Sequence, residues 1–276
     1  MTAVEDVDSR HYRFGFVANS REELPPDFDL CESRGLVSAL FLPRDDAGWF
    51  GRSRYPPRMI LLYDDALEIH AHPSSGEARS QIPLRELWCV ELGHILLDAW
   101  LRFGSEGCDR NLPYNACSSA SVHGFLAPLR RVLLPRGPGR VYLQASFGES
   151  LDLKFTNAGL HELMPDEKVL AQFFQPSRRR LTRLGPFKQE SWSSADLLAI
   201  TDRRAMWITD RHRERHQPYG TITRFAPLGA VSGYACIPSP TRVSLAVTLK
   251  SGLVWRFPVP GELEDEARAF VKAVRA

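Results

Sequence analysis

The chain presents the same order of local sequence patterns twice, and this internal repeat constrains its fold more than any other feature. In each copy, short apolar segments with the character of β-strands precede a single amphipathic helix. The first copy contains a strand pair predicted over Met59–Ala71, apolar segments at 82–92 and 95–104, and a helix predicted over Val122–Leu133. The second copy contains a strand pair over Asp196–Asp210, segments at 224–235 and 243–259, and a helix over Glu262–Arg275. Two similar domains are therefore expected.

The periodicity of these segments indicates antiparallel strands. Apolar side chains occupy every second position of Val243–Leu249, which places them on one face of a strand. The Ser251-Gly252 pair then predicts a hairpin turn, and Trp255 and Phe257 belong to the returning strand. Strands that precede one helix lack the regular strand and helix alternation of a parallel sheet. This order predicts a curved antiparallel sheet or partial barrel that the helix closes.

The two predicted helices differ in how well the local sequence supports them. Acidic residues fill the first turn of the C-terminal helix, where negative charge suits the positive end of the helix dipole. Pro128 lies inside the first helix, and proline removes a backbone hydrogen bond and can kink a helix. We still expect a helix there because apolar residues recur at helical spacing, at Val122, Phe125, Leu126, Leu129 and Leu133.

Length and composition bound the class of protein. With 276 residues, of which 43% are hydrophobic and 25% charged, the chain fits two globular domains of about 100 to 150 residues each. Residues 1–13 lack the basic and apolar regions of a signal peptide, and no apolar run approaches the roughly 18 residues of a membrane-spanning helix. The five cysteines form no Cys-x-x-Cys pair. We therefore expect a cytoplasmic protein without a transmembrane segment, in which Cys89 and Cys236 are reduced thiols packed in strands.

Particular residues within the repeat suggest a known family. The phrase LLAITDRRAMWITD, with Thr201–Arg204 at its bend, resembles the strand pair of bacterial members of the pleckstrin homology (PH) superfamily. In the first copy, LPYNACSSASVHGFLAPLR resembles the last strand of such a domain running into its capping helix. The resemblance implies a mainly β (α+β) fold class, with two PH-like partial β-barrels in tandem. Each would consist of two nearly orthogonal sheets capped by a C-terminal helix.

This resemblance divides the chain into four parts. Residues 1–55 form an N-terminal extension, 56–136 the first PH-like domain, 137–164 a linker with a β-hairpin, and 165–276 the second PH-like domain. The hairpin is predicted from two apolar segments, 141–147 and Leu151–Phe155, joined at Gly148-Glu149-Ser150. We expect the linker hairpin to brace the two domains.

The two parts of the chain carry opposite net charge. Residues 1–164 contain 17 Lys and Arg against 22 Asp and Glu, whereas residues 165–276 contain 18 against 11. The candidate anion-binding residues in the basic part are Arg178, Arg179, Arg180, Arg183, Lys188, Arg203, Arg204, Arg211, Arg213 and Arg215. Such a cluster can attract the phosphates of lipid or nucleic acid, and a solvated loop face is an equally good interpretation. Lipid-binding PH domains carry basic residues around their first hairpin, although the contiguous Arg178–Arg180 run departs from their spaced pattern.

Several catalytic and metal-binding patterns are incomplete in this sequence. His212 and His216 are four residues apart, but no Glu follows the first directly, and Pro218 and Gly220 argue against a helix. His70 and His72 share one strand face without a third ligand of recognisable spacing. Nucleophile-elbow and phosphate-loop motifs are also missing from the sequence. We therefore expect no enzymatic activity, no metal site and no cofactor.

The remaining candidates for function are binding surfaces. Trp49 and Phe50, beside glycines, form a candidate partner-contact pair, and packing of the extension onto the first domain is the alternative. The leading hypothesis is a non-enzymatic binding or assembly protein with a protein partner. The alternative is peripheral recruitment to anionic lipid headgroups at the inner face of the membrane, through the basic C-terminal domain. Nucleic-acid binding ranks lowest because aromatic residues are not interleaved with the basic ones.

Overall fold

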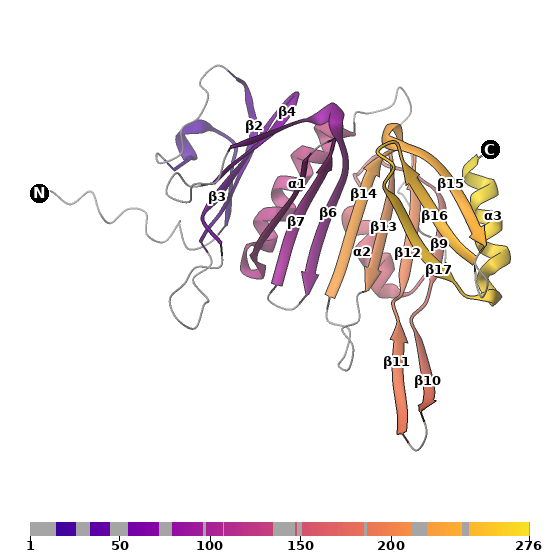
Figure 1. Ribbon diagram of the computed structural model, residues 1–276. Coiled ribbons are helices and arrows are strands. Elements are labelled where there is room, and N and C mark those ends of the chain that lie inside the picture. The colour runs from indigo at the N-terminus through magenta and orange to yellow at the C-terminus, as the bar shows by residue number, and fades with distance from the viewer. Residues whose placement is uncertain are drawn as a thin grey trace, which may run out of the picture. The chain divides into compact units, whose positions relative to one another are not determined.

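The computed structural model is mainly β, which confirms the predicted fold class at this level (Figure 1). The described residues are 15–25, 34–44, 55–71, 79–95, 98–106, 108–134, 147, 151–184, 187–210, 220–238 and 243–275. Contacts divide the chain into two compact units. The N-terminal unit comprises Met1–Leu87 and Leu96–Pro135, and the C-terminal unit comprises Trp88–Ile95 and Arg136–Ala276.

The N-terminal unit contains a five-stranded antiparallel sheet in which chain order equals spatial order. Its strands are β1 (Phe16–Ala18), β2 (Leu36–Leu42), β3 (Arg58–Tyr63), β4 (Ala66–Ala71) and β5 (Ser80–Pro83). The strand pair predicted over Met59–Ala71 is therefore confirmed. The apolar run Leu36–Leu42, which the sequence assigned to an extension, is a strand between β1 and β3 in this sheet.

The helix predicted to close the first copy is present. β7 (Asp98–Ser105) pairs antiparallel with β8 (Cys108–Asn115), and β8 runs through a one-turn helix into α1 (Ser119–Leu133). The helix continues past Pro128, and its apolar stripe is buried from Val122 to Leu129. It packs against β1 and β2, where the Ser118 hydroxyl accepts a hydrogen bond from the Gly15 N–H at 3.0 Å. This contact fixes the residues before β1 at the start of the helix.

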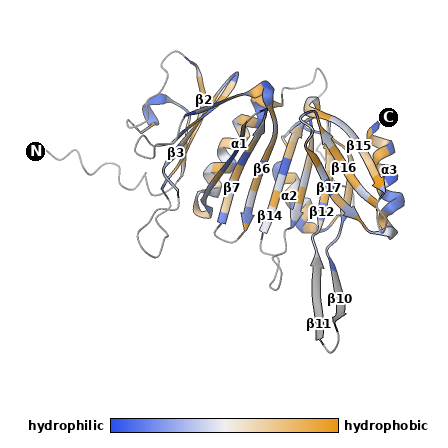
Figure 2. Ribbon diagram, in the orientation of Figure 1, coloured by the Kyte–Doolittle hydropathy of each residue, from blue (hydrophilic) through white to orange (hydrophobic). Residues whose placement is uncertain are grey.

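The C-terminal unit repeats this order of elements with an additional hairpin. Its first strands are β9 (Val169–Gln175), β12 (Asp196–Thr201), β13 (Arg204–Asp210) and β14 (Gly220–Pro227), paired as a meander. A three-stranded sheet follows, with β15 (Val231–Pro238), β16 (Val243–Leu249) and β17 (Val254–Val259), and then α3 (Glu264–Arg275). Figure 2 shows polar and apolar residues alternating along α3, whose buried residues join the core formed by both sheets.

The two copies also share a hydrogen bond at the same bend. In each, a one-turn helix follows the fourth strand of the repeat and precedes the next strand: Leu84–Glu86 before β6 (Leu87–Ile95), and Leu228–Ala230 before β15. The Leu84 N–H donates to the Asp65 carbonyl at 2.8 Å, and the Leu228 N–H donates to the Arg203 carbonyl at 2.9 Å. β6 and β15 are therefore counterparts in the repeat.

The strand predicted over Leu151–Phe155 is wrong, because this segment begins the helix α2 (Leu153–Glu162). The Asp152 side chain accepts a hydrogen bond from the Lys154 N–H at 2.9 Å and caps the helix. The alternation of Leu151, Leu153 and Phe155 suggested a strand, yet Leu153 is 73% exposed and only the other two are buried. The partner segment 141–147 lies outside the described residues, apart from Phe147.

β6 belongs to the first copy of the repeat by its place in the sequence, but its contacts belong to the C-terminal unit. Its residues Trp88–Ile95 belong to the C-terminal unit, where β6 pairs antiparallel with β14 from Val90↔Phe225 to Ile95↔Gly220. Cys89 is buried in the core of this unit. The sequence division placed this whole segment in the first domain. The contacts of Trp88–Ile95 instead make these residues a structural part of the second unit.

Candidate functional site

The basic cluster that begins at Arg178 forms a two-stranded antiparallel ribbon. β10 (Arg178–Leu184) pairs with β11 (Phe187–Ser193), and a two-residue link joins them. Gln175 of β9 pairs with Asp196 of β12. Three residues beyond this pair, Arg178 of β10 pairs with Ser193 of β11. The ribbon therefore continues the β9 and β12 pair without a change of register. Figure 1 shows it projecting beyond the ends of these two strands.

This ribbon, residues 178–193, is called the basic ribbon below. It contains five basic residues, Arg178, Arg179, Arg180, Arg183 and Lys188, and one acidic residue, Glu190. The register places Arg183 opposite Lys188 next to the link. Like charges at directly opposed positions destabilise a strand pair in general.

Arg178 ties the base of the ribbon to the rest of its unit. Its side chain forms an ion pair with Glu262, which lies in the one-turn helix just before α3. Part of its charge is therefore balanced within the protein. The side chains of the four remaining basic residues of the ribbon lie outside the described part of the chain.

Arg204, another predicted anion-binding residue, lies in the protein interior. Its side chain and that of Glu167 are both 0% exposed. The Arg204 Nε donates to Glu167 Oε1 and the Nη2 donates to Oε2, each at 2.8 Å, which is the bidentate arrangement that suits a guanidinium and a carboxylate. The guanidinium also lies 5.1 Å from the centroid of the Phe225 ring. Arg204 is thus a structural residue and is not presented to solvent.

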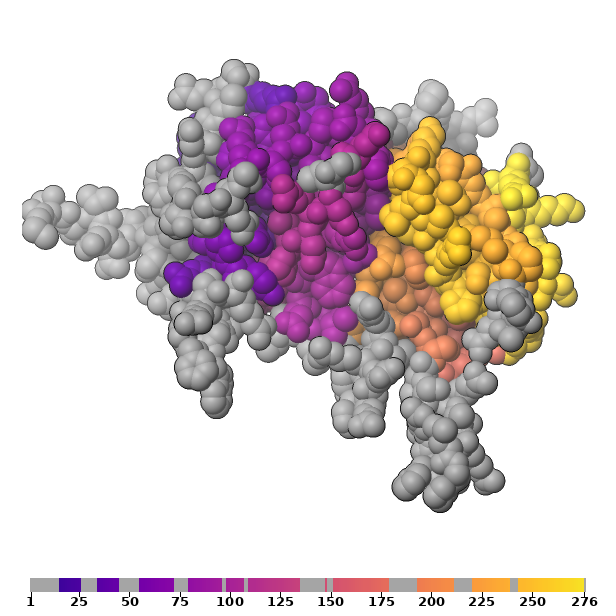
Figure 3. All heavy atoms as spheres, viewed as in Figure 1, coloured from indigo at the N-terminus to yellow at the C-terminus, as the bar shows by residue number. Residues whose placement is uncertain are grey.

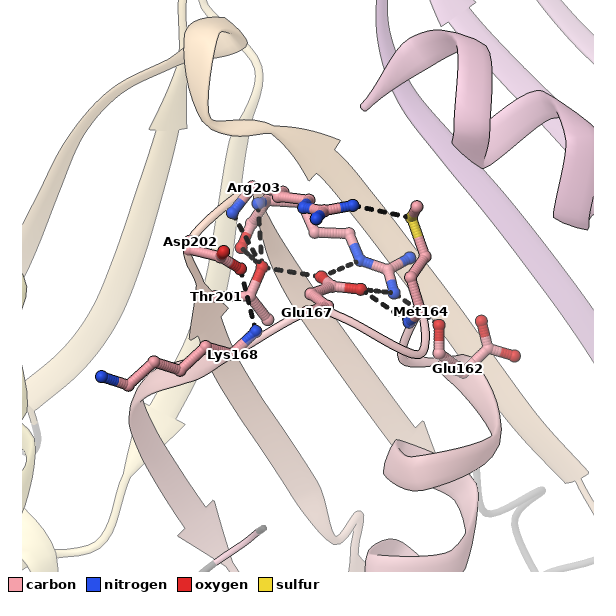
Figure 4. A network of polar contacts seen from close by, with 8 residues as sticks. Glu162, Met164, Glu167, Lys168, Thr201, Asp202 and Arg203 are labelled. Carbon is pink, nitrogen blue, oxygen red and sulfur yellow. Dashed lines mark hydrogen bonds and ion pairs between the residues drawn. The ribbon is translucent and has the colours of Figure 1, made fainter. Parts of the chain in front are cut away.

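The bend that carries Arg204 is tied to the segment before β9 by further hydrogen bonds (Figure 4). The Thr201 hydroxyl donates to Glu167 Oε1 at 2.7 Å and accepts from the backbone N–H of Arg204 at 3.0 Å. The Lys168 N–H donates to Asp202 Oδ1 at 2.9 Å, and the Asp202 N–H donates to the Lys168 carbonyl at 3.0 Å. The Thr201–Arg204 motif that carried the family resemblance therefore fixes the β12 and β13 bend.

Arg203 is also held within the protein. Its Nη2 lies 2.8 Å from Asp166 Oδ2, and its side chain is only 6% exposed. The sequence grouped Arg203 with the anion-binding candidates by charge alone. Its position in a bend between two apolar strands, with Asp166 and Glu167 upstream, is the signal that indicates an internal ion pair.

The other candidates from the sequence fall outside the described residues. These are Arg211, Arg213 and Arg215 in the basic part, and the Trp49 and Phe50 pair. In chain order, Trp49 and Phe50 lie in the connection from β2 to β3, and the basic ribbon lies in the connection from β9 to β12. Since these strands are counterparts, the repeat places both candidate contact sites in the same connection of the two copies. The sequence analysis did not make this link.

A buried carboxylate lies where β12 resumes after the ribbon. Asp196 is buried, and its Oδ1 accepts a hydrogen bond from Trp207 Nε1 at 2.9 Å. Burial raises the pKa of Asp196 because the charged form is desolvated; hydrogen bonds from Thr209 and Trp207 oppose this shift. Nearby, Lys154 Nζ lies 2.8 Å from both carboxylate oxygens of Asp210.

Asp196→Asn is expected to stabilise the protein near neutral pH. Below the ordinary aspartate pKa both the folded and unfolded states are protonated, so Asp196 carries no charge penalty. Above the raised pKa of the folded state both are ionised, and the full desolvation penalty is present. Asparagine retains the acceptor for Trp207 and removes the charge. Urea unfolding at about pH 7 and about pH 3 should show a gain that shrinks at the lower pH; equal loss of stability at both would contradict this.

Comparison with known proteins leaves the site to be interpreted from its own geometry. No protein-family model matches this sequence, and no curated protein matches it. Within the part of the chain that the structure describes, no helix is long and apolar enough to cross a membrane.

Proposed function

We propose that this protein is a non-enzymatic binding and assembly protein built from two PH-like domains in tandem. The order of elements supports this proposal. In the C-terminal unit, four strands of one sheet precede three strands of another and a final helix. In the first copy, β2 to β5, β6 to β8 and α1 follow in the same chain order. This is the order that the resemblance to the PH superfamily implies.

The observation that carries the binding function is the basic ribbon. It extends beyond the β9 and β12 pair, and its register opposes Arg183 to Lys188. A segment with this charge suits an acidic surface, and arginine binds carboxylates with two parallel hydrogen bonds. The favoured ligand is an acidic surface of a partner protein.

Affinity purification from an extract of the source cells tests this function. The full chain should capture a specific protein. A variant with Arg179, Arg180, Arg183 and Lys188 replaced by alanine should capture at least about tenfold less of this protein. Replacing Arg256 on β17, which is exposed and distant in sequence from the ribbon, is the matched control. Capture of the same protein in the same amount by the ribbon variant would count against the proposal.

Recruitment to an anionic membrane is the second candidate, favoured by the density of arginine in the ribbon. Each basic residue near such a surface contributes about 1 kcal/mol, so removing four should weaken binding by at least about a hundredfold. Sedimentation with vesicles of phosphatidylcholine, with and without phosphatidylserine, measures this. Binding that requires phosphatidylserine and is lost in the ribbon variant supports the membrane function. Equal sedimentation of the two proteins rejects it.

A further inference from the structure

The first strands of the two copies correspond residue by residue, because both contain the same irregularity. One residue of β2 is skipped in the strand pairing between Leu36 and Ser38, and one residue of β9 is skipped between Val169 and Ala171. Position 36 therefore corresponds to position 169, and the same offset applies along both strands. The pairs that define this correspondence are Leu36↔Tyr63 in the first copy and Val169↔Thr201 in the second. In Figure 3, indigo to magenta atoms belong to the first copy and orange to yellow atoms to the second.

In the first copy, a basic residue before the first strand contacts two acidic residues of the strand pair that follows. Arg34 Nη2 donates to Asp65 Oδ2 at 3.3 Å, and Asp65 lies in the bend between β3 and β4. Arg34 Nη1 donates to Glu68 Oε1 at 3.1 Å, and Glu68 is only 1% exposed. The charge order of this copy is therefore basic before the strand and acidic at the bend.

The second copy places the opposite charges at the corresponding positions (Figure 4). Glu167 lies two residues before β9, at the position that corresponds to 34, and its carboxylate accepts two hydrogen bonds from Arg204. Its neighbour Asp166 forms an ion pair with Arg203. Arg203 corresponds to Asp65, because the carbonyls of these two residues accept the same hydrogen bond at the bend. The charge order of this copy is therefore acidic before the strand and basic at the bend.

Apolar side chains alone do not distinguish β2 from β9. Leu40 of β2 and its counterpart Phe173 of β9 are both buried, and each strand pairs antiparallel with the corresponding strand of its own copy, β3 or β12. Exchange of equivalent elements is a characteristic folding error of proteins with internal repeats. We propose that the reversed charge order prevents this error, by keeping each first strand on its own copy while the chain folds.

An exchanged pairing would bring like charges together. With β2 on β12, Arg34 would lie beside Arg203 and Arg204, and the reverse exchange would place Glu167 beside Asp65. A buried charge that loses its partner or meets a like charge destabilises a structure strongly. The same penalty applies to exchange within one chain and to a strand-swapped dimer. This inference goes beyond the proposed function, because it concerns how the chain assembles and does not involve the basic ribbon.

A change of charge order in the first copy tests the inference. Arg34→Glu, Asp65→Arg and Glu68→Gln together give this copy the charge order of the second, so that exchanged pairing is no longer penalised. The matched control, Arg34→Gln, Asp65→Asn and Glu68→Gln, removes the same contacts without supplying charges that fit the other bend. Urea unfolding establishes that each variant folds.

A pair of cysteines reports exchanged pairing. Ala39 lies opposite Leu61, whereas its counterpart Gln172 lies opposite Ala199. Ala39→Cys and Ala199→Cys, added to every protein compared, therefore lie opposite each other only after an exchange, at a spacing that a disulfide can bridge. Refolding from urea with oxidised glutathione, followed by peptide mass spectrometry, measures the disulfide between positions 39 and 199.

The variant with the changed charge order should form at least about tenfold more of this disulfide than the matched control. Size-exclusion chromatography shows whether the disulfide links one chain or two. Arg34→Glu compared with Arg34→Gln is a second, smaller pair of variants that decides the question if the triple variant does not fold, and Arg34→Glu should give more of the disulfide. Equal amounts within each folded pair, or more of the disulfide in the controls, would overturn the inference.

Discussion

Replacing Arg204 by methionine is expected to lower the free energy of unfolding by about 3–5 kcal/mol, because it leaves the Glu167 carboxylate buried without its guanidinium. Both side chains are wholly buried, and two hydrogen bonds of 2.8 Å join them. Thr201 donates to the same carboxylate and holds the bend between β12 and β13. Urea unfolding followed by circular dichroism measures the loss.

A second variant separates the ion pair from the packing of the side chain. Replacing Arg204 by methionine and Glu167 by leucine together removes both charges at similar volume, and should recover part of the lost stability. Arg256→Met, at an exposed position of β17, should change stability by less than about 0.5 kcal/mol. If the single Arg204 variant is as stable as the native protein, the structural role of this pair is wrong.

A fragment that begins at residue 137, the first residue of the predicted linker before the second domain, is expected to aggregate or to lack cooperative unfolding. It lacks β6, so β14 loses the partner with which it makes six residue pairs and becomes an open edge. It also lacks Glu91, whose Oε2 accepts a hydrogen bond from Arg224 Nε at 2.5 Å, and the buried Cys89. Size-exclusion chromatography and thermal unfolding of the fragment report these losses.

Supplying the missing strand distinguishes this cause from a general effect of truncation. A synthetic peptide of residues 88–95 should bind the fragment and restore a cooperative transition, whereas a scrambled peptide of the same composition should not. A monomeric fragment that unfolds as cooperatively as the full chain would show that β6 is dispensable for the second unit.

The fold was predictable where the signal is local. Alternation over Val243–Leu249 and the Ser251-Gly252 turn predicted β16 and the start of a returning strand, and both are present. The short alternating run Leu151–Phe155 was misread because its period fits a strand, while the capping Asp152 makes it the start of a helix. The pairing of β6 with β14 could not be predicted, since no local pattern specifies which distant strand an edge accepts.

The candidate site was predicted in part. The sequence identified the density of basic residues but not that Arg178–Arg183 and Lys188 belong to one ribbon, which depends on strand register. Charge alone also grouped Arg203 and Arg204 with them, although burial and ion pairs make these two structural.

Cross-linking of lysine amines to carboxylates in the captured complex, followed by mass spectrometry, tests the central claim most directly. The chain has five lysines, which lie at Lys154, Lys168, Lys188, Lys250 and Lys272. Lys188 belongs to the basic ribbon and Lys272 to α3, so one experiment distinguishes these two parts of the surface. We predict cross-links from Lys188 to an acidic segment of the partner protein. Cross-links to the partner that arise only from Lys154, Lys168 or Lys250 would contradict the assignment of the ribbon as the binding surface.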